Sequence, residues 1–188
     1  MTEHEQLLTQ VADKARNTRP WGRPSLPEPI DAATPARAEA TLGFSLPPLL
    51  AQLHLRTADG GFGPAYGLLP LLDSAPSGEP AAVAQYLARR ESGREDPDRS
   101  WPEGVLPISH WGCGMYACVD CRSPRATVLL FGPNPGHPDH AWFLDSPDLT
   151  DRLHSWLRGT GWYEEENEDT DLAPWTGFPG PATAARTP

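Results

Sequence analysis

The sequence predicts an α+β fold in which a single antiparallel sheet of about four to six strands is flanked by N- and C-terminal helices. Apolar residues recur at helical spacing near the start of the chain, over His4–Arg16, and again after Ser146. Between these helices lie four short segments that are rich in β-forming residues and separated by Gly, Pro and Asn, which indicates an antiparallel meander. The expected strands are Val105–Trp111, Met115–Asp120, Ala126–Phe131 and His140–Asp145.

Cap and stop residues set the limits of two expected helices. Thr34, which precedes a proline, is expected to cap a helix that ends at Gly43, because glycine adopts the left-handed conformation at no steric cost. Ser146, also followed by a proline, is expected to cap the last helix, and Gly159 is expected to end it.

The chain divides into three expected parts. Residues 1–30 form an N-terminal helix and a Pro-rich loop, residues 31–162 form the folded domain, and residues 163–188 form an acidic, Pro-rich tail that we expect to be disordered. The tail holds six acidic residues and one arginine, which is half of the net charge of −10. Within it, Trp175 either docks back on the domain or belongs to a short linear motif.

Composition excludes several classes of partner. A net charge of −10 over 188 residues disfavours a nucleic-acid backbone or an anionic membrane and favours a basic protein partner. No apolar run approaches the roughly 20 residues that a membrane span needs, and the polar, acidic start of the chain is unlike a targeting segment.

Three cysteines within nine residues fit a reducing compartment better than a disulfide framework, so we expect a cytoplasmic protein.

Three short motifs follow one another along the chain. The first is Leu42–Leu50 with the glycine-rich Asp59–Pro64, the second is Trp101–Ile108, and the third is Trp111–Gly114 with a Val-Asp pair a few residues later. In order and spacing they resemble the SUKH superfamily, also called the SMI/KNR type after a yeast cell-wall synthesis regulator. The resemblance spans about residues 34–160.

The resemblance implies a non-catalytic domain that needs no cofactor. In bacteria, such domains look like immunity proteins that bind and neutralise toxins, often nucleases, and in fungi the relative is a regulatory hub. We therefore expect a bacterial immunity protein whose partner is a basic toxin that it occludes. The alternative with the same fold is a general intracellular regulatory or scaffold protein.

Five motif residues are expected to have structural roles. Gly60 and Gly61 supply the positive φ with which the chain reverses after a helix. Gly112 and Gly114 flank Cys113 at a strand junction, where a side chain would hinder close approach of the backbone.

Four further residues are the candidates for contact with a partner. Asp59 stands where the family usually has Asn, and either residue tolerates the turn. Asp120 closes its strand and is expected to cap the turn Cys121–Pro124. Trp101 and Trp111 lie at junctions of loop and strand, where a half-exposed Trp is a frequent interface anchor, although packing is favoured for Trp111.

A metal or enzymatic protein is the hypothesis from another class. His110, Cys113, Cys118 and Cys121 have the composition of a zinc site, but the alternation of the strand Met115–Asp120 favours buried, reduced thiols instead. His137 and His140 lie in a Pro/Gly-rich loop, where loop polarity is the better explanation. The chain has no G-x-S-x-G elbow and no H-E-x-x-H helix, and we expect no enzyme.

Overall fold

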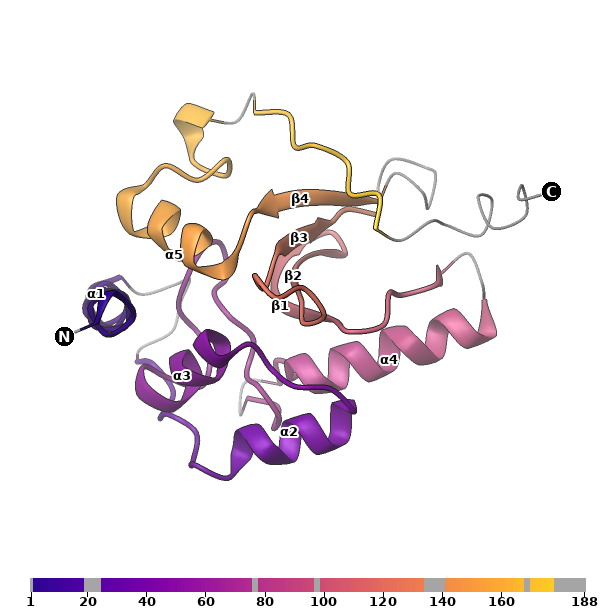
Figure 1. The fold of residues 1–188 in the computed structure, drawn as a ribbon, viewed down its shortest axis with the longest axis horizontal. Helices are drawn as coiled ribbons and strands as arrows, with labels where there is room; N and C mark the ends of the chain where they lie inside the picture. The colour runs from indigo at the N-terminus through magenta and orange to yellow at the C-terminus, as the bar shows by residue number, and fades with distance from the viewer. Residues whose placement is uncertain are drawn as a thin grey trace.

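The structure, a computed structural model, describes residues 2–18, 25–75, 78–96, 99–133, 141–167 and 170–177. It confirms the α+β fold, with helices from both ends of the chain around one antiparallel sheet (Figure 1). The helices are α1 (Glu3–Asn17), α2 (Thr34–Leu42), α3 (Pro48–Arg56), α4 (Ala82–Glu95) and α5 (Leu149–Arg158), followed by the short 3-10 helix η3 (Glu165–Asn167). The strands are β1 (Val105–Gly112), β2 (Met115–Asp120), β3 (Val128–Phe131) and β4 (Trp142–Ser146).

The four strands form a meander in the order β1-β2-β3-β4, each antiparallel to the next. Helix α4 runs below the sheet in Figure 1 and packs against β1, while α1, α3 and α5 gather at one side. Three of the four expected strands are found close to their expected limits. The third is shorter because Ala126 has a φ of 54° and turns the chain before β3 begins. His140 lies outside the described residues.

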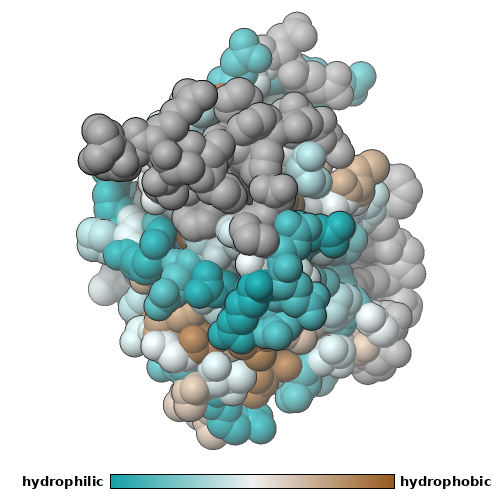
Figure 2. Space-filling view, turned by 90° about the vertical axis from the view of Figure 1, so that its right-hand side faces the viewer, coloured by the Kyte–Doolittle hydropathy of each residue, from teal (hydrophilic) through white to brown (hydrophobic). Residues whose placement is uncertain are grey.

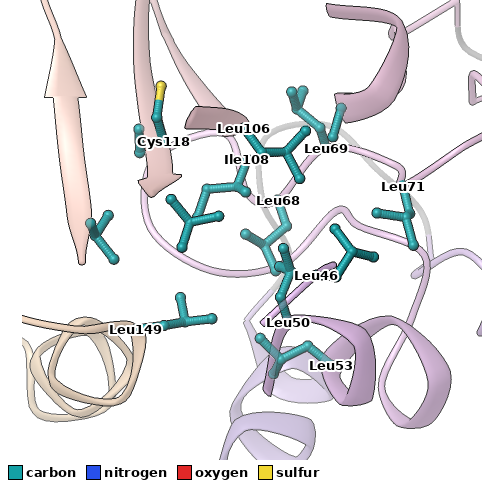
Figure 3. Packing of buried hydrophobic residues seen from close by; sticks show 14 of the residues in the cluster. Leu46, Leu50, Leu53, Leu68, Leu69, Leu71, Leu106, Ile108, Cys118 and Leu149 are labelled. Atoms are coloured by element: carbon teal, nitrogen blue, oxygen red, sulfur yellow. The ribbon is translucent and has the colours of Figure 1, made fainter. Parts of the chain in front are cut away.

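The core is built from leucines of α3 and of the loop that follows it. Leu50 and Leu53 of α3 face Leu68 of the loop and Leu106 of β1, and all four are buried (Figure 3). Leu149, at the start of α5, approaches the same cluster from the other side (Figure 3). Full burial of one such side chain contributes about 1.5–3 kcal/mol, so this cluster ties α3 and α5 to the sheet.

The glycine stops are confirmed, whereas the expected N-caps are wrong. Gly43 and Gly159 end their helices in the left-handed conformation, with φ of 81° and 66°. Helix α5 is capped by Asp148, whose carboxylate accepts from the backbone N–H of Asp151 at 2.8 Å, while Ser146 still belongs to β4. An aspartate two residues closer to the helix reaches the unpaired N–H groups that Ser146 cannot.

The cap of α2 also differs from the expected one, but it lies one residue earlier in the chain. The N-cap residue is Ala33, and the carboxylate of Asp31 accepts from the N–H groups of Ala33 and Thr34, both at 2.9 Å. Thr34 is therefore the first residue of the helix, and its hydroxyl also hydrogen-bonds to Asp31 at 3.0 Å.

The chain reverses direction after α3 through left-handed glycines. Gly60 and Gly61 have φ of 81° and 74°, as expected, and Gly61 N donates to the carbonyl of Leu68 at 2.8 Å. A Cβ at Gly60 would lie 2.6 Å from that carbonyl oxygen and 2.8 Å from the carbonyl carbon of Leu69. Only a residue without a side chain allows the returning loop to approach so closely.

The segment 170–177, which the sequence assigned to the tail, lies along the outer edge of β4 (Figure 1). Trp175 rests on Trp142 with 5.8 Å between ring centroids, so it docks on the domain. Residues 178–188 lie outside the described part of the chain. None of the described helices combines the length and the apolar character of a membrane span.

We expect Gly60→Ala to lower the free energy of unfolding by about 3 kcal/mol, because a left-handed alanine costs about 1 kcal/mol and the clash adds about 2 kcal/mol. Gly43→Ala is the matched control, since Gly43 has the same φ but no atom within 4 Å of its Cβ position. Urea denaturation of both variants measures the difference. Equal losses would contradict the close approach at Gly60.

Candidate functional site

The loop that follows the first sequence motif pairs with β1 at the point where the second motif ends. Leu69 N donates to the carbonyl of Ile108 at 2.8 Å, and Leu68 forms an antiparallel bridge with Ser109. The buried hydroxyl of Ser109 donates to the carbonyl of Gly67 at 2.8 Å. These contacts place the glycine-rich loop beside the β1–β2 hairpin, although the two segments are some forty residues apart in sequence.

This pairing brings together four side chains, which we call the hairpin surface: the exposed Tyr66 and Cys113, the half-buried His110, and Glu79, whose side chain is 10% exposed. The ring of Tyr66, at 38% exposure, stacks on His110 with 5.0 Å between centroids and 20° between planes. His110 Nε2 lies 3.7 Å from Glu79 Oε1, and Cys113 is exposed at the hairpin tip. Tyr66 is therefore a large ring that is held in place at the surface.

Backbone strain is concentrated around this surface. Three described non-glycine residues have positive φ: Cys113 at 50° belongs to the hairpin surface, Ala65 at 52° precedes Tyr66, and Ala126 at 54° lies elsewhere. A left-handed L-residue costs about 1–2 kcal/mol, and such strain clusters at functional sites. Strained backbone next to the stacked ring of Tyr66 makes this surface the best candidate for binding.

The glycines of the hairpin have a different role from the one expected. Gly112 pairs with Met115, so Cys113 and Gly114 form a two-residue turn with φ of 50° and 78°. Positive φ at both positions is the requirement of a type I′ hairpin. A Cβ at Gly112 would meet the Tyr66 ring at 3.8 Å, an ordinary contact. The handedness of the turn, rather than close backbone approach, explains these glycines.

Trp111 is half-buried and packed, as favoured from the sequence. Its ring lies 5.1 Å from Trp162 and 5.2 Å from Tyr163, and the guanidinium of Arg152 lies 5.9 Å from it. The chain that follows α5 thus folds back to cover Trp111. The ring joins β1 to the end of α5 and does not project from the surface.

Beneath these rings lies a buried ion pair between Arg152 of α5 and Asp145 of β4, whose side chains are 3% and 0% exposed. Asp145 also accepts from Trp162 Nε1 at 2.9 Å and from the hydroxyl of Ser146 at 2.8 Å. Burial by itself raises the pKa of Asp145, but the charge of Arg152 and these hydrogen bonds outweigh it and lower the pKa below its usual value.

Trp101 lies in the core and is only 2% exposed, so it cannot serve as a surface anchor. Its indole N–H donates to the carbonyl of Val105 at 2.7 Å. Its ring packs against those of Trp142 and Phe131, with 4.8 and 5.0 Å between ring centroids. The guanidinium of Arg89 covers it at 5.4 Å. Position at a strand junction does not imply exposure here, because α4 closes over the junction.

The two candidate aspartates are engaged within the domain. Asp59 Oδ1 accepts from the N–H of Leu71 at 2.8 Å and lies 3.0 Å from Nδ1 of the buried His54. Asp120 Oδ1 accepts from the N–H of Arg122 at 3.1 Å and from its Nε at 3.0 Å, which confirms the expected turn cap. Both carboxylates hold loops in place, and neither joins the hairpin surface.

The four potential zinc ligands do not converge. Cys118 is buried in the sheet, Cys113 lies at the hairpin tip, and His110 stacks on Tyr66. In the part of the chain that the structure describes, no three His, Cys, Asp or Glu side chains are grouped to hold a metal ion. His137 and His140 are outside that part.

Two residues of the hairpin surface, Tyr66 and Glu79, were not among the sequence candidates. Tyr66 lies between Gly63 and Gly67. An aromatic residue inside a glycine-rich turn is the sequence pattern that points to Tyr66 as a candidate binding residue. Its contact with His110 depends on the pairing of the loop with β1, which no local pattern reveals.

A comparison with protein families matches residues 29–155 to the model of the SMI1 / KNR4 family (SUKH-1). The match covers all three sequence motifs, the four described strands, helices α2, α3 and α4, and most of α5. No curated protein matches the chain.

The three thiols are expected to differ in reactivity. Burial raises the pKa of Cys121 to about 12 and the pKa of Cys118 well above its usual value, whereas Cys113 is exposed. A maleimide at about pH 8 should therefore modify one thiol quickly in the native protein and all three after denaturation. Mass spectrometry identifies the site. Rapid labelling that persists in Cys113→Ser would contradict this assignment.

Acid should destabilise the protein through Asp145. Because the folded-state pKa is lowered, the stabilisation is complete above the unfolded pKa of about 3.9 and is lost as pH falls through the folded pKa. In the double variant Asp145→Leu, Arg152→Met, we expect the free energy of unfolding to fall less on acidification than in the wild type. Arg152→Met alone should lower the free energy of unfolding by about 3–5 kcal/mol, since it leaves a buried carboxylate unpaired. Urea unfolding at several pH values tests all three proteins, and identical pH profiles would contradict the role of the pair.

Proposed function

Because the chain belongs to the SMI1 / KNR4 family (SUKH-1), we propose that it is a non-catalytic protein-binding domain that acts as an immunity protein. It binds a cognate toxin in the bacterial cytoplasm and covers the active site of the toxin. The family is generally known for toxin-immunity-type domains and is generally non-catalytic. The observation that carries the proposal is the hairpin surface, where the loop that follows the first motif meets the β1–β2 hairpin, which holds the third.

The geometry of the hairpin surface suits an anchor for a protein partner. Tyrosine is enriched among the residues that dominate binding energy, because its ring buries a large area and its hydroxyl forms hydrogen bonds. Stacking on His110 restricts the ring of Tyr66 before any partner arrives. Less side-chain entropy is then lost on binding, which raises the affinity for a given contact area.

Charge supports a basic partner. The net charge of −10 attracts a cationic surface such as the substrate cleft of a nuclease and speeds its association. The end of the molecule that carries the C-terminal half of α4 shows a broad band of hydrophilic residues (Figure 2), which is typical of a solvated surface. The hairpin surface, with its aromatic ring, is the better place for the close contact.

The proposal is tested by capture of the tagged protein from its native cells, followed by mass spectrometry, and by co-expression with the product of the adjacent gene. We expect one stoichiometric, basic partner whose toxicity the chain relieves. A chain that has several weak partners and relieves no toxicity would instead support a regulatory or scaffold protein.

Tyr66→Ala should weaken binding of that partner by about 2 kcal/mol, roughly 30-fold. Tyr66→Phe keeps the ring and should lose less. Leu87→Ala is the matched control, because Leu87 is a large apolar side chain of similar exposure, 43%, on another element, α4. Isothermal titration calorimetry gives the three affinities. Equal losses in Tyr66→Ala and Leu87→Ala would remove the hairpin surface from the interface while leaving the family assignment unaffected.

A further inference from the structure

The outer edge of β4 carries a short strand from the end of the chain. Phe143 and Pro174 form an antiparallel bridge, Leu144 N donates to the carbonyl of Ala173 at 2.8 Å, and Trp175 N donates to the carbonyl of Trp142 at 2.9 Å. We call residues 171–177 the strap. The strap lies beyond residue 155, where the match to the family model ends.

Few contacts hold the strap on the edge. Two backbone hydrogen bonds and one aromatic contact, of Trp175 with Trp142 at 5.8 Å, are its recorded interactions with β4. Only Leu172 and Trp175 are half-buried, and the other strap residues are exposed. A segment with so little buried surface belongs to the part of a protein that opens at low free-energy cost.

Because Pro174 has no N–H group, the two edges of the strap differ in the backbone donors that they present. Phe143 and Pro174 are a non-hydrogen-bonded pair, because the two hydrogen bonds lie on either side of it. The missing N–H of Pro174 therefore faces away from β4 and costs no bond there. It does remove a donor from the outer edge, which discourages pairing with a further strand. The strap closes the sheet for as long as it stays in place.

Release of the strap would expose a site of defined chemistry. Leu144 and Trp142 would each present a free backbone group for strand pairing, and the face of Trp142 would lose its cover. Leu144 is already one of the exposed large apolar side chains of the domain. An unpaired strand edge beside a pocket for a side chain is the feature that strand-addition domains offer to extended peptides, and the uncovered ring of Trp142 would line such a pocket.

We propose that the outer edge of β4 is a second docking site, which takes an extended segment of a protein partner by strand addition, and that the strap is its built-in competitor. This goes beyond the proposed function, because neither Tyr66 nor the hairpin surface takes part.

The contacts of the strap define the partner segment that fits the edge of β4. That segment carries an aromatic side chain at the position of Trp175 and pairs through its backbone with Trp142 and Leu144. Basic residues in the segment favour its association, because the net charge of the chain is −10.

Two variants of the full chain separate the open and closed states. Trp175→Ala removes the aromatic contact and should release the strap, and Thr176→Ala is the control within the same segment. Phe143→Cys with Pro174→Cys should lock the strap by a disulfide, because Cα atoms of a non-hydrogen-bonded pair lie about 4.5 Å apart, within disulfide range.

Hydrogen exchange followed by NMR tests the release. The Leu144 amide points to the strap, so its exchange should speed up at least tenfold in Trp175→Ala and stay slow in the locked variant. The Phe143 amide points to β3 by strand alternation, and its exchange should stay the same in Trp175→Ala. Unchanged Leu144 exchange in Trp175→Ala would overturn the competitor role.

Peptide titration tests the docking site. The probes are a capped peptide with the sequence of residues 171–177 and a basic version with arginine in place of Asp171 and Thr176. We expect Trp175→Ala to bind both peptides at least tenfold more tightly than the wild type, the basic one more tightly in low salt, and the locked variant to bind neither.

Equal binding by the released and locked variants would overturn the proposal. Concentration-dependent dimers of Trp175→Ala that form without peptide would also overturn it, because the edge would then serve strand exchange between copies of this chain. Neither experiment contains a toxin, so a negative result leaves the proposed immunity role intact, and loss of the immunity role leaves these measurements valid.

Discussion

The close return of the chain after α3 is the constraint on which the rest of the fold depends. At Gly60 the backbone passes so near Leu68 and Leu69 that no Cβ fits. This approach lets the loop bury its leucines against α3 while its backbone pairs with β1 at Ser109. The same pairing brings Tyr66 onto His110, so that core and candidate site share one turn.

A second constraint joins the late part of the chain to the sheet. The buried pair of Arg152 and Asp145 links α5 to β4, and Trp162 both hydrogen-bonds to Asp145 and covers Trp111 of β1. Buried charges need partners in a defined geometry, since an unpaired charge in the interior costs several kcal/mol, about 3–5. The pair therefore sets how α5 and the segment after it lie on the sheet.

Both edges of the sheet are closed by other parts of the same chain. The loop at Leu68 covers β1, and the strap at Pro174 covers β4. Open edges invite pairing with other chains, and short covering segments are a common protection against it. The two covers differ in strength: the first is anchored by buried leucines, whereas the strap is mostly exposed. The firmly covered edge of β1 supports the preformed hairpin surface. The loosely covered edge of β4 is suited to exchange of the strap for a partner segment.

The sequence by itself determined what depends on neighbours along the chain. Strand and helix positions follow from the periodicity of side chains, and glycines such as Gly43 and Gly60 mark backbone that only an achiral residue adopts freely. Tertiary structure alone decided exposure and pairing. Trp101 is buried because α4 closes over it, and Cys118 and Cys113 are separated because one faces the core and the other a turn. Such properties are set by contacts between residues far apart in sequence, which local patterns do not encode.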